Sequence, residues 1–60
     1  MQTFILLLTV IVGDPETGPV HTFVLDSGMS FEDCMADKHD ARHIWLGNNN
    51  IGMSCEEEVE

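Results

Sequence analysis

Four side chains in this chain of 60 residues have the chemistry of metal ligands or redox groups: Cys34, His39, His43 and Cys55. The two histidines are four residues apart, so on a continuous helix they share one face, which is the spacing of many metal-binding pairs. Asp40 follows His39 where H-E-x-x-H metalloproteases carry a longer glutamate. A third ligand is not evident unless a cysteine supplies it. We therefore treat the histidines as weak metal candidates and expect no metal or other cofactor.

The sequence lacks the other common signatures of catalysis. It contains no Gly-rich phosphate loop, no nucleophile elbow and no paired-carboxylate motif. A chain of this length buries only about 60% of the surface that its unfolded form exposes, which leaves little room for a catalytic cleft. We predict that the protein is not an enzyme.

The chain is strongly acidic. Eleven Asp and Glu residues stand against Lys38 and Arg42, which gives a net charge of −9. Such a charge repels nucleic acids and anionic lipids and attracts basic protein surfaces. We therefore predict no direct nucleic-acid binding and no membrane binding. Solubility is the ordinary explanation of the charge, and the alternative is competition with nucleic acid for a basic partner. The acidic residues expected to contact such a partner are Asp37, Asp40, Glu56, Glu57 and Glu58.

An apolar run from Phe4 to Val12 opens the chain. A secretory signal over residues 1–13 would need a basic flank and a small-residue cleavage site, and neither is present. The run is also shorter than the 18 or more residues that cross a bilayer. Its β-branched residues and the turn formers after it favour a strand buried on both faces. One face carries Phe4, Leu6, Leu8, Val10 and Val12, and the other carries Thr3, Ile5, Leu7, Thr9 and Ile11.

A hairpin is predicted after this strand. Asp14 and Pro15 suit the first two positions of a type I turn, and Gly18 can adopt a positive φ just after it. The residues Val20–Leu25 form a second β run, so the two strands are joined by a loop of about seven residues.

A helix is predicted from Ser30. Ser30 is a capping residue with Asp33 three positions later, and Met29 with Cys34 can form a hydrophobic staple. The helix weakens near His43 because turn formers follow, so Ile44–Leu46 is either its last turn or a short strand. Trp45 is expected to cover the lower end of the helix, with a role in binding as the alternative. The inward stripe is expected at Phe31, Cys34, Met35, the stem of Lys38, and Ala41 or Arg42.

The last predicted element is a strand over residues 51–55. Alternation places Ile51, Met53 and Cys55 on one of its faces. A right-handed crossover through the helix then gives an antiparallel sheet of order 2-1-3, with the opening strand in the centre. The predicted fold class is α+β, a ββαβ domain over residues 1–55 with one helix on one face of the sheet, followed by a frayed acidic tail over residues 56–60.

One face of this sheet has no predicted cover. The central strand presents Ile5, Leu7, Thr9 and Ile11 there. An exposed apolar patch of this size usually marks an interaction site. We therefore expect a homodimer or a partner protein to cover this face.

The two cysteines have two interpretations. In the predicted fold Cys34 lies in the first turn of the helix and Cys55 on the inward face of the last strand, so they are neighbours. They are either reduced core residues or a disulfide. We expect a mostly reducing, cytoplasmic environment, which favours the reduced form.

The order of these elements resembles that of short uncharacterised proteins from phages and prophages, which carry a Ser-x-x-[Glu/Asp]-Cys step at the helix start and a last strand that ends in Cys with acidic residues. The matching residues are Ser30–Cys34 and Ser54–Glu57. The resemblance covers most of the chain and implies a ββαβ fold with a possible helix-to-strand disulfide, and it assigns no activity or catalytic residue. Many acidic phage proteins of this size bind a host defence or regulatory protein, which suggests the first hypothesis below.

Three functional hypotheses follow. The first is a small acidic binding protein that inhibits or modulates a basic host protein in the host cytoplasm. The second is a metal- or redox-responsive module built on Cys34, Cys55, His39 and His43. The third is an exported or membrane-associated peptide with residues 1–13 as its signal.

Overall fold

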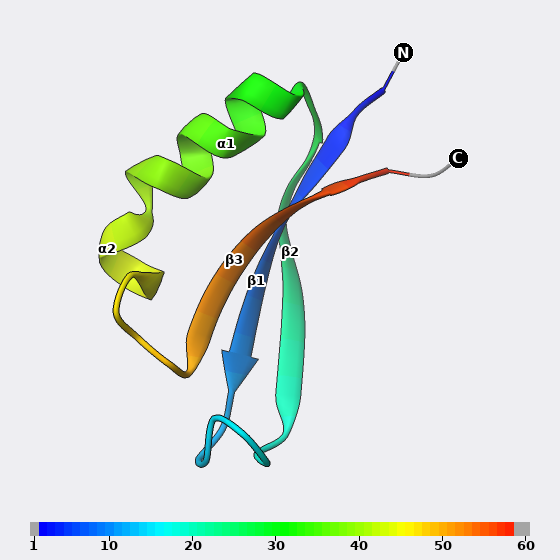
Figure 1. Cartoon of the computed structure of the whole chain (residues 1–60). Helices are drawn as coiled ribbons and strands as arrows, with labels where there is room; N and C mark the ends of the chain where they lie inside the picture. The colour runs from blue at the N-terminus through cyan, green and yellow to red at the C-terminus, as the bar shows by residue number, and fades with distance from the viewer. Residues whose placement is uncertain (1, 59–60) are drawn as a thin grey trace.

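A computed structural model describes residues 2–58 of the chain. Its elements are β1 (Phe4–Ile11), β2 (Val20–Met29), α1 (Phe31–Asp40), α2 (Arg42–Trp45) and β3 (Ile51–Glu57). The strands form an antiparallel sheet of order β2-β1-β3, and the helices lie on one side of it (Figure 1). The predicted α+β class and strand order are confirmed. Because the opening run is the central strand, removal of residues 1–13 as a signal would destroy this fold.

The β1–β2 connection is a polar loop over residues 12–19. The Asp14 carboxylate accepts a hydrogen bond from the Glu16 N–H at 2.9 Å, and the Asp14 carbonyl accepts one from the Gly18 N–H at 2.7 Å. Gly18 does not have the positive φ that the sequence predicted. It is needed instead because a Cβ there would overlap the Val12 carbonyl oxygen and lie 2.7 Å from that of Asp14.

β2 continues past its predicted end at Leu25 and reaches Met29. Two shifts in its register with β1 accommodate the polar residues after Leu25. Gly28 has a φ of 68° in the second irregular segment, a value that suits glycine at a β-bulge. Its N–H donates a 2.5 Å hydrogen bond to the Glu58 carboxylate. The polar stretch is tolerated because β2 is an edge strand, where a bulge disrupts pairing on one side alone.

β3 also runs beyond the predicted domain end at Cys55. Glu56 and Glu57 pair with Ile5 and Phe4 of β1, and the Glu58 N–H donates to the Thr3 carbonyl at 2.9 Å. The prediction of a frayed tail is therefore wrong for residues 56–58. The remaining tail residues, 59 and 60, lie outside the described part of the chain.

The start of α1 is the predicted cap. The Ser30 hydroxyl accepts a hydrogen bond from the Asp33 N–H at 3.1 Å, and Met29 and Cys34 both belong to the buried cluster. The end of α1 departs from prediction, because Ala41 has φ −90° and ψ 11° and interrupts the helix. The Arg42 guanidinium donates to the freed His39 carbonyl at 3.0 Å, which satisfies a helix-end acceptor.

α2 settles the undecided segment: Ile44 and Trp45 are helical, and Leu46 is extended. The Trp45 indole N–H donates to the Lys38 carbonyl at 3.0 Å, and the Lys38 ammonium lies 5.5 Å from the ring centroid. Trp45 also packs against the core. Its predicted position over the lower end of α1 is confirmed.

The core is very small. Its buried side chains are Leu6, Met29, Cys34 and Met53. Of the predicted inward stripe, Phe31 and Met35 are exposed, because α1 contacts the sheet mainly through its buried Cys34. Phe31 contacts Phe4 edge to face, with ring centroids 5.2 Å apart. The molecule is thin, with extents of 38 × 25 × 13 Å, since one layer of helix covers one layer of sheet.

Candidate interaction surface

The sheet face opposite the helices, called here the open face, collects apolar side chains from two strands. The strand register places Leu7 beside Val24, Thr9 beside Thr22, and Ile11 beside Val20. Opposite residues of an antiparallel pair point to the same face. On the β3 side, the residues opposite Thr9, Leu7 and Ile5 are small or polar: Gly52, Ser54 and Glu56. The open face consists of Ile5, Leu7, Thr9, Ile11, Val20, Thr22, Val24, Gly52, Ser54 and Glu56.

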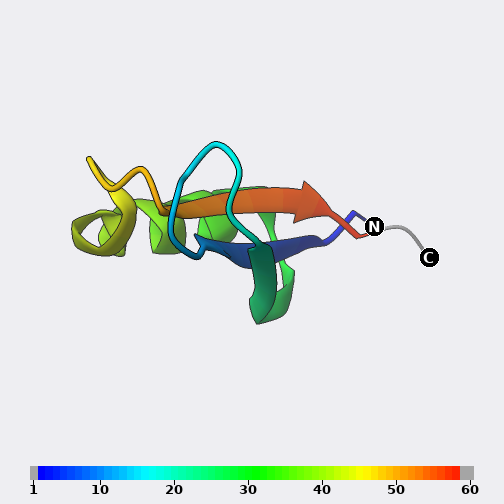
Figure 2. The same ribbon diagram turned by 90° about the horizontal axis from the view of Figure 1, so that it is seen from below.

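The predicted residues of the central strand therefore do lie together, and β2 adds two that the prediction missed. Val20 and Val24 are 59% and 60% exposed, whereas the β1 side chains are half-buried by their neighbours. The signal was present in the period-2 alternation of Val20, Thr22 and Val24. In Figure 2 β2 projects away from the helical layer, which packs on β1 and β3.

The open face has no cavity of its own, because residues 2–58 form no pocket. The chain exposes 4343 Å², whereas a compact protein of 6.7 kDa exposes about 3,900 Å². Its radius of gyration is 12.2 Å, against roughly 10 Å for a compact domain of this length. The open face is therefore better suited to contact with a macromolecular surface than to enclosure of a small ligand.

Negative charge lies at one end of the open face. Glu56 stands beside Ile5, and Glu58 pairs with Thr3 next to it. The two basic side chains both lie in the helical layer: Lys38 stacks on Trp45, and Arg42 contacts His39. A partner that approaches the open face thus meets an apolar surface with the β3 carboxylates at one end, the loop that carries Asp14 and Glu16 at the other, and the cations on the other side of the sheet.

The five predicted acidic residues do not form one surface. Asp37 and Asp40 lie in the second half of α1, which leads into α2, whereas Glu56 and Glu57 end β3 near the N-terminus (Figure 1). Glu58 is further engaged with Gly28. Because α1 and β3 run in opposite directions, the end of α1 lies far from the end of β3, and the prediction did not take this into account.

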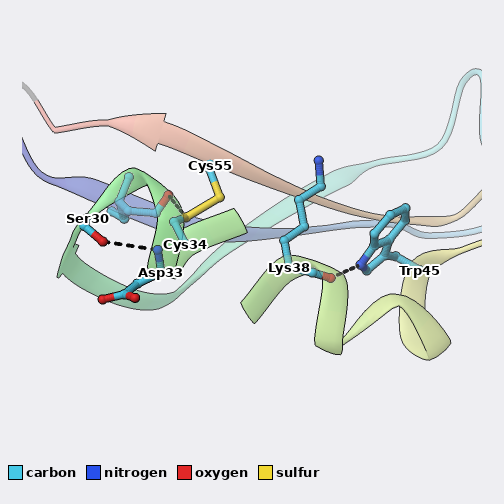
Figure 3. Close-up of a disulfide and its surroundings, with 7 residues drawn as sticks. Ser30, Asp33, Cys34, Lys38, Trp45 and Cys55 are labelled. Atoms are coloured by element: carbon cyan, nitrogen blue, oxygen red, sulfur yellow. Dashed lines mark hydrogen bonds between the residues drawn. A yellow bond between two sulfur atoms is a disulfide. The ribbon is translucent and has the colours of Figure 1, made fainter. Parts of the chain in front are cut away.

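Cys34 in the first turn of α1 and Cys55 in β3 form a disulfide, with a Cα–Cα distance of 6.1 Å (Figure 3). The sequence favoured reduced cysteines over a disulfide, and the structure contains the disulfide instead, because the first turn of α1 places Cys34 directly over Cys55 of β3. Cys34 is fully buried. In a reducing compartment this bond would open, so the stability of the domain depends on the redox state of its surroundings. The bridge also occupies both thiols that a metal site would need.

The histidines do not form the predicted pair on one helix. His39 lies in the last turn of α1 and His43 in α2, and the break at Ala41 separates them. The His39 Nδ1 lies 3.3 Å from an Arg42 guanidinium nitrogen. Within residues 2–58 the structure shows no group of three side chains able to hold a metal ion. The spacing in sequence was misleading because i, i+4 geometry requires an unbroken helix.

Comparison with known proteins returned no family model, no curated protein and no solved structure that matches the chain. The resemblance to phage proteins stays a prediction from short motifs. In the part of the chain that the structure describes, none of the helices has the length and apolar character needed to cross a membrane.

Proposed function

We propose that this protein is a small, non-enzymatic binding protein whose open face docks on a basic surface of another protein. The observation that carries the proposal is the combination of Leu7, Ile11 and Val24 on an uncovered sheet face with carboxylates at its end. Following the resemblance to phage proteins, we further propose that docking inhibits or modulates a host protein.

The size of the molecule allows an interface of ordinary size. Its two larger extents, 38 and 25 Å, give the whole molecule an outline of about 950 Å², against roughly 800 Å² per partner in a standard protein–protein interface. The apolar centre supplies the affinity and the acidic end supplies orientation and speed of association with a basic surface. The same charge acts against nucleic acids as direct ligands.

The proposal is tested by capture from host lysate with the wild-type protein and a Leu7→Lys variant, at low and high salt. Leu7 lies in the middle of the open face, so a lysine there disrupts an apolar contact and repels a basic partner. The matched control is Leu46→Lys, which makes the same change at an exposed position after α2. We expect a captured protein that is lost with Leu7→Lys, retained with Leu46→Lys and weakened by salt.

Thr9→Lys serves as a second variant, since it places the same charge on the open face without removing an apolar side chain. Circular dichroism establishes that each variant is folded. Capture of the same proteins by wild type and both open-face variants, or capture that is indifferent to salt, contradicts the proposal.

A further inference from the structure

The free edge of β2 is a second uncovered surface, distinct from the open face. The order β2-β1-β3 leaves β2 paired on one side only. Nine of its ten residues are exposed, and Met29 at its end is the buried one. An edge strand presents unpaired backbone N–H and C=O groups, which are a template for another strand.

The hydrogen-bond pattern shows which backbone groups point outward. The Val12 N–H donates to the Pro19 carbonyl at 2.9 Å, so residues 12 and 19 form a hydrogen-bonded pair. Such pairs alternate with non-bonded pairs along an antiparallel ladder. In the register of Ile11 with Val20, residues 21 and 23 therefore bond to β1, whereas the N–H and C=O groups of Val20, Thr22 and Val24 face the free edge.

This stretch is regular and uncharged. Pairing with β1 is unbroken from Val20 to Val24, and the bulges begin only beyond it. Natural edge strands are usually protected by charges, prolines or bulges, and residues 20–24 contain none of these. β3, which forms the other edge, carries Glu56 and Glu57. In a chain of net charge −9, residues 20–24 thus let two copies pair without placing a carboxylate of this stretch in the contact.

The outward groups are also self-complementary. If two β2 strands run antiparallel about a twofold axis at Thr22, Thr22 faces Thr22 of the second copy, and Val20 faces Val24. All three outward-facing residues of each strand then form hydrogen-bonded pairs, while His21 lies opposite Phe23. A shift of the centre to Phe23 would place Val20 opposite Asp26 and lose two of these bonds, because Asp26 lies in the bulged segment.

We propose that the protein forms a homodimer through the β2 edge at residues 20–24, which produces one continuous six-stranded sheet. The sequence predicted self-association across the open face, and this arrangement leaves that face free. A twofold axis perpendicular to the sheet keeps both helical layers on one side. It also joins the two open faces, with Val20 and Val24 of both copies at the centre. The pairing reduces the excess exposure of the monomer, which is 4343 Å² against about 3,900 Å² for a compact chain.

The test is sedimentation equilibrium of the oxidised wild type, Thr22→Pro and Thr22→Val. Proline at 22 removes one outward N–H without breaking a bond to β1, and edge strands tolerate it there. Valine keeps that N–H and the strand preference, so it is the matched control. We expect wild type and Thr22→Val to have twice the chain mass of 6.7 kDa, and Thr22→Pro to have the monomer mass.

Amide hydrogen exchange gives a second readout. In the wild type the amides of Val20, Thr22 and Val24 should be protected together with those of His21 and Phe23. In Thr22→Pro the amides of Val20 and Val24 should lose protection, while those of His21 and Phe23 keep it and report an intact β1–β2 ladder. A monomeric wild type, a Thr22→Pro dimer, or free exchange at Val20 and Val24 in the wild type overturns the proposal. Leu7→Lys leaves the edge unchanged, so failure of partner capture would not imply failure of the dimer.

Discussion

Reduction of the Cys34–Cys55 disulfide should remove a large part of the stability of the fold. The bond joins residues 21 apart in sequence. The loop-closure relation for a loop of this length gives about 3.3 kcal/mol at 25 °C. A 60-residue domain has a free energy of unfolding of roughly 3–9 kcal/mol in total. The disulfide thus contributes between a third and all of the margin that separates the folded from the unfolded chain.

The assay is thermal unfolding followed by circular dichroism, at one fixed protein concentration, for the oxidised protein, the reduced protein and a Cys34→Ala/Cys55→Ala variant. Intact mass establishes the redox state of each sample. For so short a domain, a loss of about 3.3 kcal/mol corresponds to a fall in Tm of roughly 15–25 °C. Fixed concentration matters because dimerisation also raises Tm by mass action.

Comparison of the reduced protein with the double variant separates two contributions. The reduced protein keeps both sulfur atoms and loses the covalent constraint alone, whereas the variant also loses the side-chain volume of the fully buried Cys34. We expect the double variant to unfold at a lower temperature than the reduced protein, because a cavity is added to the lost constraint. A fall in Tm of less than about 5 °C on reduction, equal to about 1 kcal/mol, would refute the loop-closure reasoning.

Two further changes test the local structure by thermal unfolding. Ser30→Ala should lower the free energy of unfolding by about 1 kcal/mol because the Asp33 N–H loses its acceptor. Ser30→Asp keeps an acceptor and should be nearly neutral. Equal stability of wild type and both variants would contradict the cap. Gly18→Ala should lower the free energy of unfolding by more than about 1 kcal/mol because its Cβ would lie 2.7 Å from the Asp14 carbonyl oxygen. The control is Gly52→Ala, whose Cβ meets no atom within 4 Å and which should be tolerated. A neutral Gly18→Ala would contradict this steric argument.

The sheet order could be predicted because one strand carried a strong signal. The residues Phe4–Val12 are almost entirely apolar on both faces, which favours a central strand, and the missing basic flank and cleavage site argued against a signal peptide. The cap at Ser30 was equally local, since it depends on Ser30, the N–H of Asp33 and the neighbouring Met29. Features that depend on a few adjacent residues were thus readable from the sequence.

Strand lengths were not predictable in the same way. Asp26, Ser27 and Gly28 have the composition of a turn, yet they continue β2 because bulges absorb them at an edge. Glu56 and Glu57 have the composition of a solvated tail, yet they extend β3 because the unpaired start of β1 offers them backbone partners. In both cases the pairing of a distant strand outweighed local propensity, and no local pattern contains that information.

The helix break at Ala41 has the same kind of cause. Alanine is the best helix former, so its own preference does not end α1. Side chains that follow the break hold the turn: the Trp45 indole N–H donates to the Lys38 carbonyl while Trp45 packs on the core, and the Arg42 guanidinium donates to the His39 carbonyl. Because the helix is interrupted at Ala41, the predicted pairing of His39 and His43 on one helix is wrong, and the sequence argument for a metal site no longer holds.

The small core and the apolar open face are related, because apolar side chains that could have enlarged the core lie on the uncovered side of the sheet. With four buried side chains among residues 2–58, this chain has little apolar burial of its own, yet it places Ile5, Leu7 and Ile11 where an antiparallel sheet normally carries polar residues. Covering each of these half-buried side chains would contribute about 1 kcal/mol. Their sum is about 3 kcal/mol, which is comparable to the contribution of the disulfide. Part of this gain offsets the entropic cost of association. A partner that binds only the folded chain would stabilise the reduced protein by an amount that rises with the partner's concentration relative to its Kd, so binding and folding of this protein are expected to be thermodynamically coupled.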